Sequence, residues 1–148
     1  MIAPDSAGRL MAKIAAGVPG TAGAAHVRAT IAAYYASYAE DEPDLDARAA
    51  LFAPGCRFED PAGRVVAEDR EALRHFFTQV VPDGWTFRFR LERVAVVGDE
   101  AVSTSVLTVH GPDRTPVEAI IDAHWVFASD GLVAGVRTFF DEEALRDL

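Results

Sequence analysis

An aspartate that precedes a proline is the residue of this sequence best suited to chemistry. Asp60 lies before Pro61 in the run CRFEDPAG, which ends at Gly63. Proline pushes the residue before it into an extended conformation and glycine lets the chain reverse, so we expect the Asp60 carboxylate at the edge of a turn. Apolar neighbours such as Phe58 would raise its pKa by desolvation, toward the range that suits a general base. Asp-Pro is also a common turn starter, so a purely structural role is the alternative.

A tyrosine on the first long helical pattern is the second candidate. Val27, Ile31, Tyr34 and Tyr38 recur at spacings of four, three and four, which is one face of a helix. Tyr34 therefore points toward the core, where its hydroxyl needs a hydrogen-bond partner. That partner is either another protein group or a bound ligand.

The sequence offers no set of metal ligands, and we expect neither a metal ion nor an organic cofactor. The four histidines, at positions 26, 75, 110 and 124, lack the spacing of a metal site. His75 is expected at the surface or edge of a helix rather than as a ligand. The single cysteine, Cys56, excludes an internal disulfide and a thiolate cluster.

Composition limits the partners that the protein can have. A chain of 148 residues fits one domain with a real core. The net charge of −9 argues against a nucleic acid, since phosphate binding needs clustered Lys and Arg, and it disfavours an anionic membrane surface. The sequence has no apolar run of about 18 residues and no pattern of a signal peptide, so we expect a cytoplasmic protein with no membrane partner.

Three helices are predicted before residue 82. The first covers 24–39, the second covers 45–52 with Asp44 as its N-cap, and the third follows Asp69. Ala53-Pro54-Gly55 is expected to end the second helix, and residues 65–67 to form a short strand. A further short helix over 6–16 is followed by a linker rich in Gly and Pro. We therefore divide the chain into an extension, 1–23, and a domain, 24–148.

From Trp85 onward the pattern changes to alternation of apolar and polar residues, which predicts strands. The four predicted long strands cover residues 85–97, 101–110, 116–127 and 132–140. Helices followed by strands with short connections indicate an α+β fold, with three N-terminal helices packed on a strongly curved mixed or antiparallel sheet. Such curvature would leave an internal apolar pocket for a small hydrophobic ligand.

Some strand residues are apolar on both faces of the predicted sheet. Ala119, Ile120, Ile121 and Ala123 are consecutive or nearly so, and alternation places them on opposite faces. The outer face therefore needs a cover, and a second copy of the chain is the simplest one. We expect a homodimer.

At this point the sequence resembles the nuclear-transport-factor-2-like superfamily, in its ketosteroid-isomerase and SnoaL-like branch. The resemblance covers about residues 24–141. It is carried by Phe58-Glu59-Asp60-Pro61-Ala62-Gly63, by Leu73-Arg74-His75-Phe76-Phe77, and by the closing hairpin from Trp125 to Phe140 with Gly131 at its turn. The resemblance implies the cone-shaped fold, but the same fold serves many reactions and also proteins without catalysis.

The resemblance implies roles for individual residues. The proton-shuttling aspartate of ketosteroid isomerases falls on Asp60, and their oxyanion-binding tyrosine falls on Tyr34. The analogous reaction is removal of a proton beside a ketone, with donors that stabilise the enolate oxygen. Residues implied in binding the substrate are Phe58, Phe77, Trp125, Val136 and Phe140.

The third catalytic position of the family is where this sequence departs. An aspartate is expected there, and the position falls on Ala123, one residue after Asp122. A β-bulge before Trp125 would turn Asp122 to the inner face, where it could act as the acid of a SnoaL-like cyclase. His124 shares a face with Asp122, so a contact between them is the alternative.

Three functional hypotheses follow from these residues. The first is an enzyme that acts on a hydrophobic ketone or a polyketide-like substrate, with Asp60 as the base and Tyr34 and Asp122 as partners. The second is a non-catalytic module that binds a small ligand or dimerises. The third is a hydrolase or dehydratase of the same fold, which would need a second acid or a histidine near Asp60.

Overall fold

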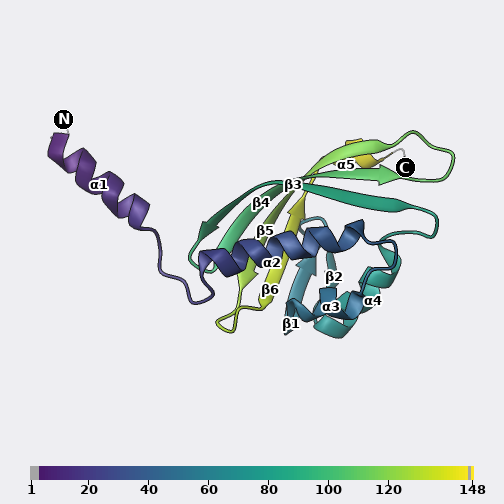
Figure 1. The fold of residues 1–148 in the computed structure, drawn as a ribbon, viewed down its shortest axis with the longest axis horizontal. Coiled ribbons are helices and arrows are strands. Elements are labelled where there is room, and N and C mark those ends of the chain that lie inside the picture. Colours follow the sequence, from purple (N-terminus) through teal and green to yellow (C-terminus); the bar gives the residue numbers. More distant parts are fainter. Residues whose placement is uncertain (1–3, 147) are drawn as a thin grey trace.

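A curved six-stranded sheet with helices across its concave face forms the body of the protein (Figure 1). The computed structural model describes residues 4–146 and 148, so residues 1–3 of the predicted extension lie outside the described residues. The helices are α1 (Pro4–Ala16), α2 (Ala24–Ala36), the 3-10 helix η1 (Ser37–Ala39), α3 (Leu45–Ala50), α4 (Arg70–Gln79) and α5 (Glu142–Leu145). The strands are β1 (Phe52–Glu59), β2 (Val65–Ala67), β3 (Thr86–Val97), β4 (Glu100–His110), β5 (Val117–Phe127) and β6 (Val133–Phe139).

The sheet is mixed, with the strand order β2-β1-β6-β5-β4-β3. Short turns join β3 to β4, β4 to β5 and β5 to β6, so these neighbours are antiparallel. β1 pairs in parallel with β6, and β2 pairs antiparallel with β1. This arrangement brings the end of β1, which carries the Asp60 turn, beside the end of β6.

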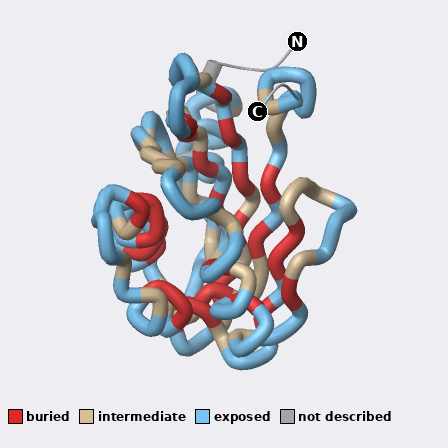
Figure 2. Tube along the Cα trace, turned by 90° about the vertical axis from the view of Figure 1, so that its right-hand side faces the viewer, coloured by how far each residue is buried: buried red, intermediate tan, exposed pale blue. Residues whose placement is uncertain are grey.

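Burial alternates along β4 and β5, which shows which of their side chains face the helices. Figure 2 shows buried and exposed residues alternating along strands of the sheet. On β5, Ile121, Ala123 and Trp125 are buried, whereas Ile120 and Asp122 are exposed. The helix α2 lies across the inner face and buries its apolar side chains there. Because successive side chains of a strand point to opposite faces, the strand residues divide into an inner set and an outer set.

Most of the predicted elements are confirmed. The helix predicted over 24–39 is present as α2 and η1, and the four long strands and the short strand are present within one or two residues of their predicted ends. Both predicted N-caps are confirmed, because Asp44 accepts a hydrogen bond from the Ala47 N–H at 3.0 Å and Asp69 accepts one from the Ala72 N–H at 2.7 Å. No helix in the described part of the chain is long and apolar enough to cross a membrane.

Two expectations about the elements are wrong. The described residues form five α-helices: α1 is the short helix expected over 6–16, but α5, after the sheet, adds to the three helices expected for the domain. Residues 53–55 do not end the second helix but belong to β1, which begins at Phe52. The pairing of β1 with β6 is irregular between Phe52 and Arg57, so Pro54 lies where the regular ladder is interrupted. A proline without an N–H is tolerated at such a position.

The predicted extension divides into two parts. In Figure 1, α1 projects away from the sheet, and its Leu10 and Ile14 side chains are exposed. Residues closer to α2 are instead attached to the β3–β4 turn. The Asp99 carboxylate accepts hydrogen bonds from the N–H groups of Thr21 and Ala22, each at 2.8 Å, and from the Thr21 hydroxyl at 2.9 Å.

These contacts predict that two truncations differ. Deleting residues 1–16 should leave the melting temperature within about 2 °C of the full chain, because the exposed helix adds little packing. Deleting residues 1–23 should lower it by about 4–8 °C, since it also removes the groups that satisfy Asp99. Differential scanning calorimetry of both truncations, with Asp99→Ala in the full chain as the matched control, measures the difference. Equal melting temperatures for the two truncations would contradict this division.

Candidate active site

The turn after β1 holds Asp60 in a fixed position. Asp60 follows the last residue of β1, and the Asp60–Pro61 peptide bond is cis. The Asp60 N–H donates to the Arg64 carbonyl at 2.9 Å, and the Ala62 N–H donates to the Thr138 carbonyl of β6 at 2.8 Å. The turn is therefore closed on itself and attached to the neighbouring strand.

Asp60 and the residue before it are carboxylates with opposite environments. Glu59 accepts the Gly63 N–H at 2.8 Å and lies 3.1 Å from the Arg137 guanidinium. The Gly63 N–H, followed by the charges of Arg137 and Arg57, lowers the pKa of Glu59. Burial raises the pKa of Asp60 above the ordinary value of 3.8. Adjacent carboxylates with pKa values pushed apart divide the roles of fixed anion and proton acceptor.

Thr138 is a site residue that the sequence analysis missed. Its hydroxyl donates to Asp60 Oδ1 at 2.5 Å. This bond, together with the charge of Arg64, acts against burial and lowers the pKa of Asp60, but burial is the larger effect. Thr138 lies two residues after Val136 on β6, so strand alternation from a predicted pocket residue could have found it.

An apolar cavity of about 120 Å³ lies beside the Asp60 carboxylate on the inner face of the sheet. Six of the residues predicted for the site border it: Tyr34, Phe58, Asp60, Trp125, Val136 and Phe140. Phe77, also predicted, lies instead in the core, with its ring 6.1 Å from that of Tyr34. Phe76 takes its place at the cavity, because adjacent helical residues point about 100° apart.

A larger open groove shares part of its lining with the cavity. Asp60, Phe76, Val80 and Phe140 border both spaces, and the groove has a volume of about 690 Å³. Arg64 and other residues of the Asp60 turn form its far side. A ligand longer than the inner cavity could therefore place one end beside Asp60 and extend outward.

Two buried tyrosines supply hydroxyl groups to the inner cavity. The Tyr34 and Tyr38 hydroxyls are 3.1 Å apart and form a hydrogen bond. Burial raises the pKa of both phenols, so both stay protonated at neutral pH. Two O–H groups share one mutual hydrogen bond, which leaves one proton to donate to a ligand. Tyr35 also borders the cavity; burial raises the pKa of its phenol, and the nearby Ser103 and Ser105 hydroxyls act against this rise.

The structure places Asp122 away from the cavity. β4 and β5 pair without a bulge from Glu118 to Val126, so Asp122 points to the outer face and accepts a hydrogen bond from the Thr104 hydroxyl at 2.6 Å. The bulge considered from the sequence is absent from this stretch, and Ala123 faces inward. The suggested contact between Asp122 and His124 is also wrong. His124 binds Glu100 instead, with 2.8 Å between Nε2 and Oε1.

No group of three or more His, Cys, Asp or Glu side chains among the described residues is arranged to hold a metal ion. The chemistry that the cavity offers therefore comes from one carboxylate of raised pKa, its threonine partner and protonated phenols.

Comparison with known proteins gives a family match and a similar enzyme. Residues 31–136 match the family described as the SnoaL-like domain. A steroid Delta-isomerase of Nocardioides simplex is 33% identical over 116 residues, which cover 78% of this chain and 90% of that protein.

Two solved structures resemble the fold. An NTF2-like protein of unknown function from Burkholderia pseudomallei has a TM-score of 0.71 at 18% identity, over 83% of this chain and 96% of that one. A protein described as a SnoaL-like polyketide cyclase from Jannaschia species CCS1 has a TM-score of 0.69 at 23% identity, over 82% and 90%. At these identities the likeness concerns the fold alone.

The raised pKa of Asp60 predicts how stability changes with pH. Unfolded Asp titrates near 3.8, whereas folded Asp60 titrates higher, so the wild type loses stability as pH rises from that value through the folded pKa. Asp60→Asn lacks this loss and keeps an oxygen for the Thr138 hydroxyl. It should be at least as stable as the wild type at neutral pH. In Thr138→Val the loss should extend to higher pH, while Thr138→Ser should resemble the wild type.

Urea unfolding of these four proteins between about pH 3 and pH 8 measures the free energy of unfolding directly. An Asp60→Asn variant that is clearly less stable than the wild type at neutral pH would identify the carboxylate as a structural turn group.

Proposed function

The chain belongs to the SnoaL-like domain family, and on this premise we propose that it is an enzyme that moves a proton on a carbon beside a ketone. The observation that carries the proposal is the Asp60 carboxylate, which borders an apolar cavity with its pKa raised by burial. A general base works best when its pKa lies near the working pH. A substrate carbon is too weak an acid to react without such a base and without stabilisation of the resulting enolate.

The proposed reaction shifts a double bond toward a carbonyl. Asp60 takes a proton from the carbon between a ketone and a C=C bond, and the electron pair forms a dienolate whose oxygen accepts a hydrogen bond from Tyr34. Asp60 then returns the proton to the far end of the former C=C bond, which gives the conjugated ketone and restores the carboxylate. Thr138 holds Oδ1 during both transfers, so Oδ2 carries the proton.

Ala123 limits the rate that this site can reach. The alanine faces inward but offers no hydrogen-bond donor at the position where the related isomerases are expected to place a protonated aspartate. Removing one donor to a developing oxyanion costs roughly 10²–10³ in kcat. The proposed enzyme therefore depends on its phenols alone and should be slower than a site with both donors.

The shape of the site favours a flat or elongated apolar substrate. A cavity of about 120 Å³ holds only the reacting end of a large ketone, and the open groove can take the rest. The inner walls are aromatic rings and aliphatic side chains, which contribute affinity by burial rather than by charge. The proposed substrate is a steroid-like ketone, as the name of the steroid Delta-isomerase relative suggests, or a polyketide-like ketone of similar shape.

A non-catalytic ligand-binding module is the second candidate. The inward-facing Ala123 favours it, because a cavity that only binds needs no second donor. Asp60 is the only carboxylate among the described residues that border the inner cavity, and no histidine borders it. This composition offers no support for a hydrolase or dehydratase that needs a second acid at the same place.

Turnover of a β,γ-unsaturated ketone tests the proposal. The wild type should form the conjugated product, followed by its ultraviolet absorbance, and Asp60→Asn should lower kcat by about 10²–10⁴-fold because the base is lost. Asp122→Asn is the matched control, since it removes a carboxylate from the outer face and should leave the rate unchanged. Saturable binding of such ketones without turnover by the wild type would support the binding module instead.

The outer face of the sheet supports the expectation of a homodimer. Val102, Ile120 and Phe139 lie on neighbouring strands and are 52%, 62% and 46% exposed. Exposed apolar side chains on one face of a sheet are typical of an interface, and a two-fold axis would let one copy cover the other. The proposal is that two chains pack through this face.

Light scattering at micromolar concentration should give the mass of a dimer. Ile120→Arg should shift the wild-type dimer to a monomer, because it places a charge in the buried interface. Val97→Arg is the control, since Val97 is equally exposed, at 60%, but lies at the β3–β4 turn. A monomeric wild type, or dissociation by both variants, would contradict the proposed interface.

A further inference from the structure

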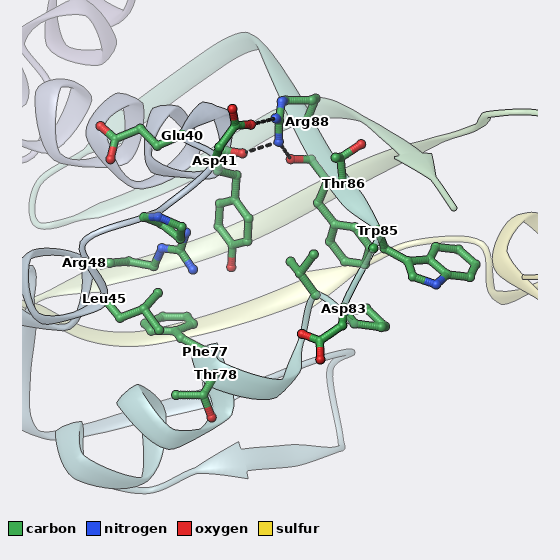
Figure 3. A pocket seen from close by; sticks show the side chains of 16 residues that line it. Glu40, Asp41, Leu45, Arg48, Phe77, Thr78, Asp83, Trp85, Thr86 and Arg88 are labelled. Carbon is green, nitrogen blue, oxygen red and sulfur yellow. Dashed lines mark hydrogen bonds and ion pairs between the residues drawn. The ribbon is translucent and has the colours of Figure 1, made fainter. Parts of the chain in front are cut away.

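A second groove, drawn in Figure 3, differs in most of its lining from the Asp60 cavity. It has a volume of about 390 Å³ and lies between the segment from η1 to α3 and the segment from α4 to β3. Only Tyr38 and Phe87 border both spaces. The proposed reaction uses none of the other residues of this groove.

Arg48 is the unusual member of the groove. Its side chain extends from α3 into the ring of residues in Figure 3, yet Arg48 is only 3% exposed. Its Nε donates to the Ser37 hydroxyl at 2.7 Å, and Nη2 makes a long contact of 3.4 Å with the Ser37 carbonyl. Nη1 donates no hydrogen bond to any described residue, and no carboxylate in the described part of the chain forms an ion pair with it.

Aromatic rings stabilise the positive charge of Arg48 only in part. The guanidinium carbon lies 3.8 Å from the centre of the Tyr38 ring and 5.0 Å from that of Phe77. Such cation–π contacts are favourable but hold the guanidinium by its flat face. The part of its edge that Ser37 does not occupy, which includes both N–H groups of Nη1, is left to meet a partner in the groove. Buried arginines are otherwise almost always paired with an anion.

The walls of the groove restrict what that anion can be. Phe77, Val81 and Trp85 are apolar and suit a ring or a hydrocarbon body. The rim carries the carboxylates of Glu40 and Asp83, which oppose a second negative charge. A guanidinium edge matches the two oxygens of a carboxylate.

We propose that this groove binds a monocarboxylate with an apolar body, with its carboxylate on the free edge of the Arg48 guanidinium. The site is separate from the Asp60 cavity and does not depend on the reaction proposed there. Its ligand class is an aromatic or alicyclic carboxylic acid in its ionised form.

Phenylacetate, titrated into the ¹⁵N-labelled full chain and followed by NMR, tests the site. Phenylacetamide is the neutral isostere and should bind at least about tenfold more weakly, because it cannot form a charged pair with Arg48. Phenylphosphonate, compared in mildly alkaline buffer where it is mostly a dianion, should also bind more weakly than phenylacetate. The shifted amide signals should belong to residues 78–86, and Asp60→Asn should leave the affinity unchanged.

Two variants change the affinity in opposite directions. Arg48→Gln should abolish the preference for phenylacetate over phenylacetamide. Asp83→Asn removes one rim charge from an exposed loop and should tighten phenylacetate binding about two- to threefold. Thermal unfolding reports whether each variant is folded, and Asp83→Asn with the isostere comparison decides the question even if Arg48→Gln does not fold.

Four results would overturn the proposal. Equal affinities for phenylacetate and phenylacetamide would show that the charge of Arg48 is not used. Unchanged selectivity in a folded Arg48→Gln would make Arg48 a structural group that only stacks on Tyr38. Signal shifts centred on Val136 and Thr138 would place the ligand in the other cavity. Tighter binding of phenylphosphonate would assign the groove to a phosphate-like dianion.

Discussion

Burial of one carboxylate is the interaction on which the candidate active site depends. Asp60 loses water on the inner side of the sheet and receives in return one hydrogen bond from Thr138, with burial as the larger effect on its pKa. The turn that carries Asp60 is hydrogen-bonded within itself and to β6, and these bonds hold the carboxylate in its buried position. Glu59, one residue earlier, is satisfied by Gly63 and Arg137, so the two adjacent carboxylates cannot exchange roles. A buried carboxylate of raised pKa beside an apolar cavity suits the proton transfer proposed above.

The register of the sheet decides which other groups can join Asp60. Because β4 and β5 pair without a bulge around Asp122, strand alternation sends that carboxylate outward and turns Ala123 inward. The same alternation gathers Trp125 from β5 with Val136 and Thr138 from β6 at the cavity. The helix α2 then supplies the phenol of Tyr34 from the opposite side. The candidate site therefore combines one carboxylate of raised pKa with protonated phenols, and Ala123 adds no polar group to it.

Much of this arrangement was predictable from the sequence, for identifiable reasons. Periodicity located α2, α4 and the four long strands, and the resemblance to the SnoaL-like branch is confirmed by the family match. Strand β1 was missed because Pro54 and Gly55 look like a terminator, whereas the irregular pairing with β6 tolerates them. The sequence predicted Phe77 at the cavity, where the structure has Phe76, because the spacing of apolar residues alone does not fix the rotation of a helix about its axis. No sequence pattern identified Arg48 as a site residue, because only tertiary packing shows that its charge is buried.

Exchange of hydrogen for deuterium beside a carbonyl is the most direct test of Asp60 as a base, since it requires only that a ketone binds. A saturated cyclic ketone incubated in deuterium oxide with the wild type should exchange its α-hydrogens faster than in buffer, as followed by proton NMR. Asp60→Asn, shown to bind the same ketone, should exchange no faster than buffer. Equal acceleration by both proteins, or none by a wild type saturated with ketone, would contradict the assignment of Asp60 as the proton-transferring group.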